Sequence, residues 1–161
     1  MRGLSPIVAI VLMIGLTVSI SILVTVWITN WVTFQTTNPE LACALTTNYV
    51  IDSAVYTNQT NELLIKITNK AKREIYGFGV VLTNGTHAQQ FNYTQVWQPE
   101  INASKPLERE RTAYIKLNSS SISDTGEEFN STFAMTVNEI IITNEVCRAV
   151  SAKTTNIQKL I

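Results

Sequence analysis

The N-terminal quarter of this chain contains one long run without a charged residue. The run covers 37 consecutive positions, Gly3 to Pro39, and begins at the last residue of a short leader, residues 1–3. Its apolar part, Leu4 to Phe34, would form a helix of roughly 45 Å at about 1.5 Å per residue. That exceeds both the ~20 residues that span a bilayer and the apolar core, about 7–15 residues long, of a cleaved secretory signal. We therefore expect the segment to be retained and to be buried on every side.

Local signals mark the expected ends of this helix. Ser5 is a favoured N-cap, and Pro6 suits the first helical position, where its missing N–H costs nothing. Asn38-Pro39 should stop the helix, because proline cannot continue it and displaces the preceding residue from the α region. The sequence therefore predicts a transmembrane or filament-core helix over residues 4–37. Its outer end carries an aromatic stripe at helical spacing that is typical of a membrane interface, formed by Trp27, Trp31 and Phe34.

The opening residues MRGLSPIVAIVLM resemble the N-termini of archaeal type IV pilin precursors. In that family a basic residue and a glycine precede a Ser-Pro-Val/Ile run that opens a long apolar helix, and the likeness here covers residues 2–25. The resemblance implies that a membrane-embedded prepilin peptidase cuts between Gly3 and Leu4, and that the helix is kept as the core of a filament. Bacterial type IV pilins usually have glutamate at the fifth mature position, where this chain has Val8.

Charge at the N-terminus predicts how the chain is oriented in a membrane. Arg2 and the α-amine should stay on the cytoplasmic side by the positive-inside rule, so residues 40–161 are expected outside the cell. These residues are numerous enough for one domain with a modest core. The expected localisation is the cell membrane for the precursor and an extracellular filament on the cell surface for the mature protein.

The residues after the helix favour short β-strands without helical periodicity. Asn84-Gly85 is a strong hairpin signal between two of them, and Gly77 and Gly79 suggest a bulge or a close neighbour inside a third. The expected fold class is α+β, with a long N-terminal apolar helix followed by an antiparallel, immunoglobulin-like β-sandwich over residues 40–161. The candidate strands are Tyr49–Thr57, Glu62–Thr68, Ile75–Thr83, Ala88–Val96, Thr112–Leu117, Phe129–Val137 and Ile140–Val150.

Two cysteines flank the predicted domain. Cys43 follows the helix, and Cys147 lies in the last predicted strand. An even pair outside the cell indicates a disulfide, which would tie that strand to the base of the helix. Two free thiols are the alternative. Ala42-Cys43-Ala44 also matches a signal-peptidase site, but the apolar run is too long and ends well upstream.

Asparagines in Asn-x-Ser/Thr sequons recur between the two cysteines. Chance predicts about three sequons from 14 Asn and 32 Ser plus Thr residues in 161 positions. The chain has six, and all lie on the side predicted to be extracellular, where such Asn are N-glycosylation acceptors. They are Asn58, Asn84, Asn92, Asn102, Asn118 and Asn130. We expect at least three to carry glycan, with Asn84 and Asn118 favoured because they lie in predicted turns.

Residue types that carry catalysis or bind cofactors are sparse. His87 is the single histidine and reads as a surface residue, and the sequence shows no metal-ligand spacing and no glycine-rich phosphate loop. We therefore expect no enzyme activity, no metal and no cofactor. The formal net charge is zero and no basic face is visible, so nucleic acid is not an expected partner.

Together these features predict a structural subunit of an archaeal type IV pilus that polymerises through its N-terminal helix. The expected partners are further copies of the chain, the prepilin peptidase with the membrane assembly machinery, the membrane itself and attached glycans. Two alternatives remain open. One is an archaellin, the subunit of the archaeal swimming filament, and the other is a membrane-anchored extracellular binding protein.

Overall fold

The computed structural model describes residues 6–37 and 39–161, so the predicted processing site between Gly3 and Leu4 lies outside the described residues. The chain divides into two compact units, residues 1–41 and residues 42–161. In the first unit, helix α1 covers Pro6–Thr37. It begins at the predicted proline and ends just before the predicted Asn38-Pro39 break. A second helix, α2 (Pro39–Thr46), then starts with proline at its first position and was not predicted.

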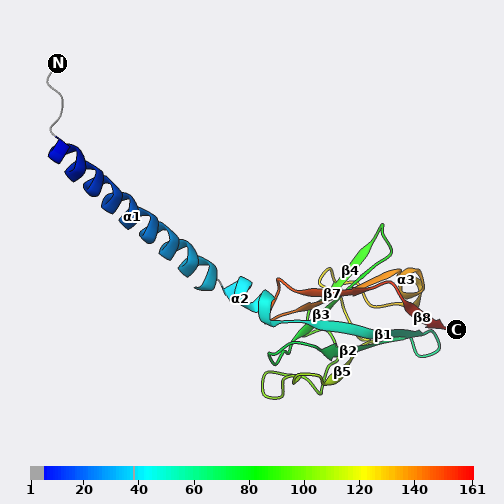
Figure 1. Cartoon of the computed structure of the whole chain (residues 1–161). Coiled ribbons are helices and arrows are strands. Elements are labelled where there is room, and N and C mark those ends of the chain that lie inside the picture. Colours follow the sequence, from blue (N-terminus) through cyan, green and yellow to red (C-terminus); the bar gives the residue numbers. More distant parts are fainter. Residues whose placement is uncertain (1–5, 38) are drawn as a thin grey trace. The chain divides into compact units, whose positions relative to one another are not determined.

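The second unit consists of two four-stranded sheets (Figure 1). One has the order β5-β2-β1-β8 and the other β4-β3-β6-β7. Omitting β8, these orders match the A-B-E and C′-C-F-G sheets of an immunoglobulin-like sandwich. The strands are β1 (Tyr49–Thr57), β2 (Glu62–Asn69), β3 (Phe78–Thr83), β4 (Ala88–Phe91), β5 (Thr112–Leu117), β6 (Glu139–Asn144), β7 (Ser151–Thr154) and β8 (Ile157–Leu160). The predicted α+β class is confirmed.

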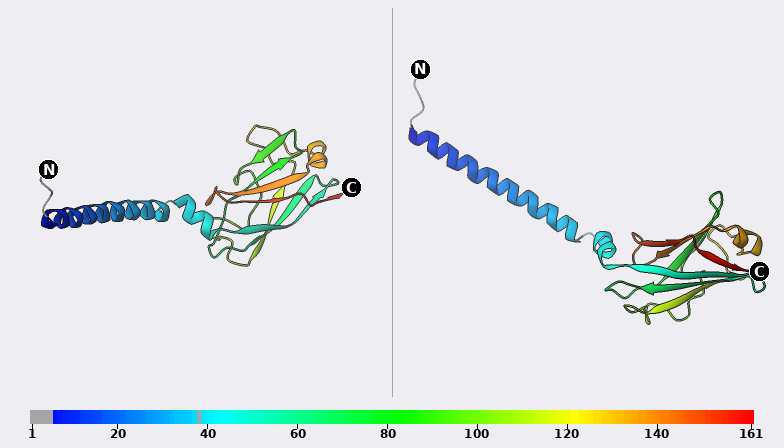
Figure 2. Two further views of the ribbon diagram at one scale, coloured as in Figure 1. Left: turned by 45° about the horizontal axis from the view of Figure 1, so that its top comes forward. Right: turned by 45° about the vertical axis from the view of Figure 1, so that its right-hand side comes forward.

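One strand pairing departs from the predicted antiparallel pattern. β8 runs parallel to β1, with Ala54 opposite Ile157 and Thr57 opposite Leu160, whereas the other pairings between described strands are antiparallel. Figure 2 shows β8 at the C-terminal end of the chain. β8 was not predicted, because its four residues form too short a pattern to indicate a strand before their partner is known.

The stretch 129–137 was predicted as a strand, and this prediction is wrong. It contains helix α3 (Ser131–Thr136), which is capped by Asn130: the Asn130 side-chain oxygen accepts a hydrogen bond from the Phe133 N–H at 2.8 Å. The other helix end is held by Lys159 of β8, whose Nζ donates to the carbonyls of Met135 (2.7 Å) and Val137 (2.9 Å).

Three further strand boundaries also differ from the prediction. The strand expected from Ile75 begins at Phe78, the strand expected to reach Val96 ends at Phe91, and the last predicted strand, 140–150, is divided. β6 ends at Asn144, and β7 begins only at Ser151.

Alternating apolar residues from both sheets meet in one core. Phe129 packs edge-on against both Tyr56 and Phe91, with ring centroids 6.2 Å apart in each pair. Burial alternates along β2: Leu63, Ile65 and Ile67 are buried, and the residues between them are only partly buried. From the facing sheet come Phe78, Val80, Leu82, Ile140 and Ile142. The Asn84-Gly85 hairpin is also present: Gly85 has φ +90°, and the Asn84 N–H donates to the His87 carbonyl at 3.1 Å.

Candidate functional site

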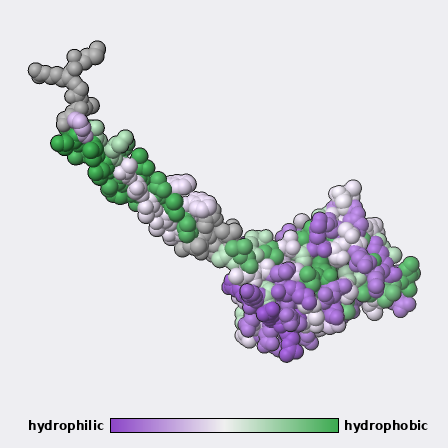
Figure 3. Space-filling model, viewed as in Figure 1, coloured by the Kyte–Doolittle hydropathy of each residue, from purple (hydrophilic) through white to green (hydrophobic). Residues whose placement is uncertain are grey.

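Helix α1 presents a long exposed surface. Every side chain from Pro6 to Phe34 is exposed in the single chain. Apolar residues occur on all sides of the helix: Ile22, Leu23 and Val24 follow one another around a single turn and are 59%, 70% and 47% exposed. Figure 3 shows hydrophobic residues along the length of the helix. Residues 6–34 are long and apolar enough to cross a membrane.

Six hydroxyl groups of α1 are turned back onto the helix itself. Each donates to a backbone carbonyl three or four residues earlier, at 2.7–2.9 Å. Such bonds satisfy these hydroxyls without a partner chain or water. The residues are Thr17, Ser19, Ser21, Thr25, Thr29 and Thr33. The sequence itself carries this signal, because a Ser or Thr inside a helix can bond the carbonyl four residues before it.

A shallow apolar groove of about 380 Å³ runs along one side of α1. Short hydroxyl side chains alternate there with branched apolar ones, and short side chains let a second helix approach closely. The lining residues are Thr17, Val18, Ser21, Ile22, Thr25 and Val26. Beyond the groove, the predicted aromatic stripe is present, and Trp27, Trp31 and Phe34 are 67%, 55% and 68% exposed.

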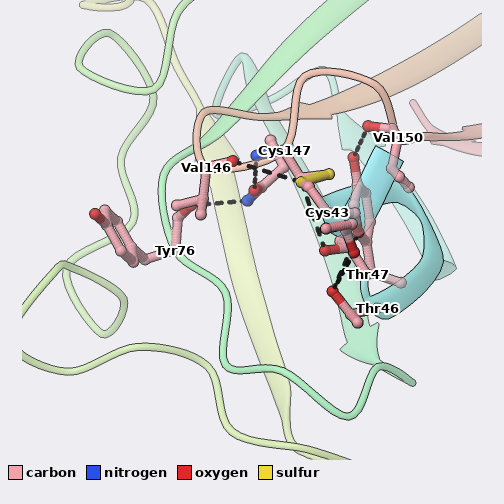
Figure 4. Close-up of a disulfide and its surroundings, with 10 residues drawn as sticks. Cys43, Thr46, Thr47, Tyr76, Val146, Cys147 and Val150 are labelled. Atoms are coloured by element: carbon pink, nitrogen blue, oxygen red, sulfur yellow. Dashed lines mark hydrogen bonds between the residues drawn. A yellow bond between two sulfur atoms is a disulfide. The ribbon is translucent and has the colours of Figure 1, made fainter. Parts of the chain in front are cut away.

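The predicted disulfide is present between Cys43 and Cys147, although its second end is not in a strand. Cys43 lies on α2, and Cys147 lies in the connection between β6 and β7, with a Cα–Cα distance of 5.7 Å (Figure 4). Both residues are buried. The Cys147 N–H donates to the side-chain oxygen of Asn144 at 2.9 Å, and the Asn144 amide donates to the Tyr76 carbonyl at 2.7 Å. The bridge therefore anchors the C-terminal part of α2 to a connection that is itself well ordered by hydrogen bonds.

Tyr49 provides a second link close to the bridge. It is the first residue of β1, and its hydroxyl lies 3.0 Å from the carbonyl of Ile142 on β6 of the other sheet and 2.8 Å from the carbonyl of Val150 in the β6–β7 connection. Its ring packs edge-on against Phe78 at 5.3 Å. Burial raises the pKa of the Tyr49 hydroxyl, because the charged phenolate would lose its solvation. The hydroxyl therefore remains a neutral donor between the two sheets.

The six sequon asparagines all lie in turns or connections. Asn58 follows β1, Asn84 is in the β3–β4 hairpin, Asn92 follows β4, Asn102 lies before β5, Asn118 follows β5 and Asn130 caps α3. Among the described residues, three of their amide nitrogens donate no hydrogen bond: those of Asn58, Asn102 and Asn118. The other three are engaged: Asn84 with Thr136 Oγ1 (3.2 Å), Asn92 with Asp124 Oδ1 (2.5 Å) and Asn130 with the Glu128 carbonyl (3.3 Å). Glycan occupancy stays a prediction.

His87 lies at the surface beside a carboxylate. Its Nε2 is 3.1 Å from Glu127 Oε2, and Gln89 Nε2 donates to the same oxygen at 3.0 Å. Hydrogen bonds from Gln89 and then His87 lower the pKa of the Glu127 carboxyl. Within residues 6–37 and 39–161, no group of three or more His, Cys, Asp or Glu side chains is arranged to hold a metal ion.

No family model and no curated protein matches the sequence. Two solved structures share part of the backbone arrangement. The ligand-binding region of Serine-glutamate repeat protein A of Enterococcus faecium aligns with a TM-score of 0.38 at 10% identity, covering 71% of this chain and 97% of that chain. A beta-glucosidase from Listeria innocua aligns with a TM-score of 0.31 at 8% identity, covering 71% and 16%. Similarity at this level does not indicate a shared function.

Proposed function

We propose that this chain is the structural subunit of an extracellular filament of the archaeal type IV pilus kind, and that copies polymerise through α1. The observation that carries the proposal is the uncharged, mainly apolar surface of α1, which is exposed on every side over residues 6–34 and has six hydroxyls bonded within the helix. A helix that is apolar all round must be buried, either in lipid or among other helices. The pilin-like opening sequence favours both environments in turn: lipid before assembly, and neighbouring helices in the filament.

Transfer of α1 from membrane to filament fits its chemistry. Lipid tails and packed Leu, Ile and Val side chains are similarly apolar, so no large hydrophobic penalty opposes the exchange. The internal hydrogen bonds of Thr17, Ser21 and Thr25 persist during the transfer, so these hydroxyls are not left unpaired. Removal of the leader would take away Arg2, the charge that would otherwise have to enter an apolar core. Identical subunits added in this way form an open helical assembly.

The second unit suits the outside of such a filament. Its disulfide is typical of proteins exported from the reducing cytosol. Its sequons lie outside strands, where a glycan can be attached without breaking a sheet. The sandwich would then form the outer wall while the α1 helices bundle at the centre.

Val18 offers a direct test, because it lies in the groove near the middle of α1. A charge there costs about 2.5–3.5 kcal/mol in a bilayer, and an unpaired charge in a packed core costs several kcal/mol. We expect Val18→Asp to abolish filaments seen by negative-stain microscopy, while the matched control Val18→Ala keeps them. An immunoblot of the membrane fraction would show that the Asp variant still accumulates. Val18→Asp filaments at wild-type yield would contradict a dry helical core.

Cells that make the wild-type protein distinguish the two alternatives, a membrane-anchored binding protein and an archaellin. A wild-type protein that is exported and folded but forms no fibre would be a membrane-anchored binding protein. Fibres that rotate tethered cells would identify an archaellin.

A further inference from the structure

A polar pocket of about 420 Å³ opens on the second unit, where the end of β4 approaches the junction of β3 and β6. Its volume is within the ~300–1,000 Å³ range of small-molecule sites. Its lining includes the sequon residue Asn92, the neighbouring Tyr93, the carboxylate of Asp124, and two glycines, Gly77 and Gly79. The pocket therefore combines an aromatic ring with groups that donate and accept hydrogen bonds.

The two glycines keep the floor of this pocket at the level of the backbone. A Cβ on Gly79 would lie 2.9 Å from Thr143 Oγ1, closer than Cβ atoms come in proteins, and 3.1 Å from the Phe91 carbonyl oxygen, which is a tight contact. Gly77 has φ +69°, a conformation that favours glycine. A Cβ on Gly77 would meet the Tyr93 ring at 3.7 Å, so the ring lies directly beside bare backbone. Tyr93 is 42% exposed, which leaves part of its ring available for contact.

The Asn92 side chain is held in place within the pocket lining. Its Nδ2 donates to Asp124 Oδ1 at 2.5 Å, and the Asp124 N–H donates to the Gln90 carbonyl at 2.8 Å. Only one amide hydrogen is needed for the bond to Asp124. An amide nitrogen that carries a sugar retains one hydrogen, so the same bond can persist after modification.

We infer that this pocket seats the first sugar of a glycan attached to Asn92. Attachment forms a bond between Asn92 Nδ2 and the anomeric carbon of a phosphate-linked lipid oligosaccharide; the lipid phosphate leaves, and the amide nitrogen loses one proton. The apolar face of the sugar then packs on the Tyr93 ring, and its hydroxyls reach Thr143 Oγ1 and the Asp124 carboxylate, where a charged acceptor strengthens the hydrogen bond. The inference rests on the export that the proposed function includes, since the oligosaccharide is transferred outside the cytosol.

Asn130 also borders a pocket, of about 510 Å³, but it is less suited to seat a sugar. Its side-chain oxygen caps α3, and its nitrogen donates to the Glu128 carbonyl, so the side chain is committed to the local backbone. That pocket also holds a carboxylate, Glu127, but the Asn130 amide does not bond it, and the Phe133 ring is partly buried against the core. At Asn92, by contrast, the amide nitrogen itself donates to the Asp124 carboxylate, and the neighbouring Tyr93 ring is exposed.

The test compares two variants of the full-length chain that each remove one sequon without changing its Asn. Thr94→Ala removes the Asn92 sequon, and Thr60→Ala, the matched control, removes the Asn58 sequon; both threonines are exposed. The proteins are made in a cell that N-glycosylates exported proteins and, in parallel, in one that does not. Peptide mass spectrometry reports occupancy at Asn92, and thermal unfolding reports Tm.

In the glycosylating cell, we expect glycan at Asn92, a Tm loss of roughly 4 °C or more for Thr94→Ala, and a loss of under about 1 °C for Thr60→Ala. Tyr93→Ala should lower Tm in the glycosylated wild type but add little to Thr94→Ala, because both changes remove the same contact. In the cell that does not N-glycosylate exported proteins, Thr94→Ala should leave Tm unchanged.

Three results would overturn the inference: an unmodified Asn92, equal Tm losses for the two sequon variants, or a Thr94→Ala loss that persists without glycosylation. Imaging filaments from the same cultures shows whether only the pocket assignment fails or the proposed function fails as well. Loss of the seated sugar leaves α1 and its packing untouched, so filaments without an Asn92 glycan would overturn only the pocket assignment.

Discussion

The Cys43–Cys147 bridge makes the sharpest quantitative prediction for the second unit. It joins positions that are 104 residues apart and so closes most of the folded unit into one loop. In the chain-entropy description, a loop of this length constrains the unfolded chain by about 4.7 kcal/mol, whereas native disulfides removed from small exported domains cost about 2–5 kcal/mol. Opening the bridge should therefore remove a large fraction of a total stability of about 5–15 kcal/mol.

This free energy converts into a measurable change in melting temperature. At about 2.1 cal/mol/K per residue, the roughly 120 residues of the unit have an unfolding entropy near 0.25 kcal/mol/K. A loss of 2–5 kcal/mol then lowers Tm by about 8–20 °C. We expect this shift for Cys43→Ala and Cys147→Ala in the soluble fragment 40–161, measured by circular dichroism or calorimetry.

A double-substitution cycle shows whether the bridge itself is responsible. Either single substitution breaks the same bond, so the double variant should lose about as much stability as each single variant. A reducing agent should lower the Tm of the wild-type fragment to that of the variants and leave the variants unchanged. If the stability losses of the two single variants add up in the double variant, or if reduction does not change the Tm of the wild-type fragment, the reasoning is refuted. The lower Tm of the variants would then come from local packing.

Other predictions concern the links between strands and the processing site. Lys159→Met should cost about 1–3 kcal/mol in chemical denaturation, because its ammonium bonds two carbonyls at the end of α3; the exposed control Lys153→Met should cost under about 0.5 kcal/mol. Tyr49→Phe should cost about 1–3 kcal/mol at neutral pH. Because burial raises the pKa of Tyr49, its contribution to the free energy of unfolding is complete below about pH 10 and is lost as the pH rises further. The Tyr49→Phe variant should therefore lose less stability than the wild type at alkaline pH. Intact mass of the mature protein should begin at Leu4, and Gly3→Val should block processing; an intact N-terminus in assembled fibres would contradict this.

Features set by neighbouring residues could be predicted from the sequence. The bounds of α1 follow from Pro6 and from the Asn38-Pro39 break, since proline acts on its own turn. β1 and β5 have the predicted bounds, and the Asn84-Gly85 hairpin lies where it was expected. The disulfide was predicted because a pair of cysteines outside the cell has only one intramolecular partner each.

Features that depend on distant partners were decided by tertiary structure. β8 is a strand because β1 lies beside it, about a hundred residues away in the chain. The stretch 129–137 has residues that suit a strand, but its one deeply buried ring, Phe129, packs between Tyr56 and Phe91, and the Asn130 cap then starts a helix.

The candidate sites divide in the same way. Sequence alone identified the uncharged helix and the six sequons, because charge and short motifs are local properties. It could not show that Asn92 lies against Asp124 and beside bare glycine backbone, or that Tyr49 bonds the opposite sheet. Each of these depends on where a backbone group or a side chain from another part of the chain lies, and a short hydrogen bond or a close contact exists only once the fold has brought its two atoms together.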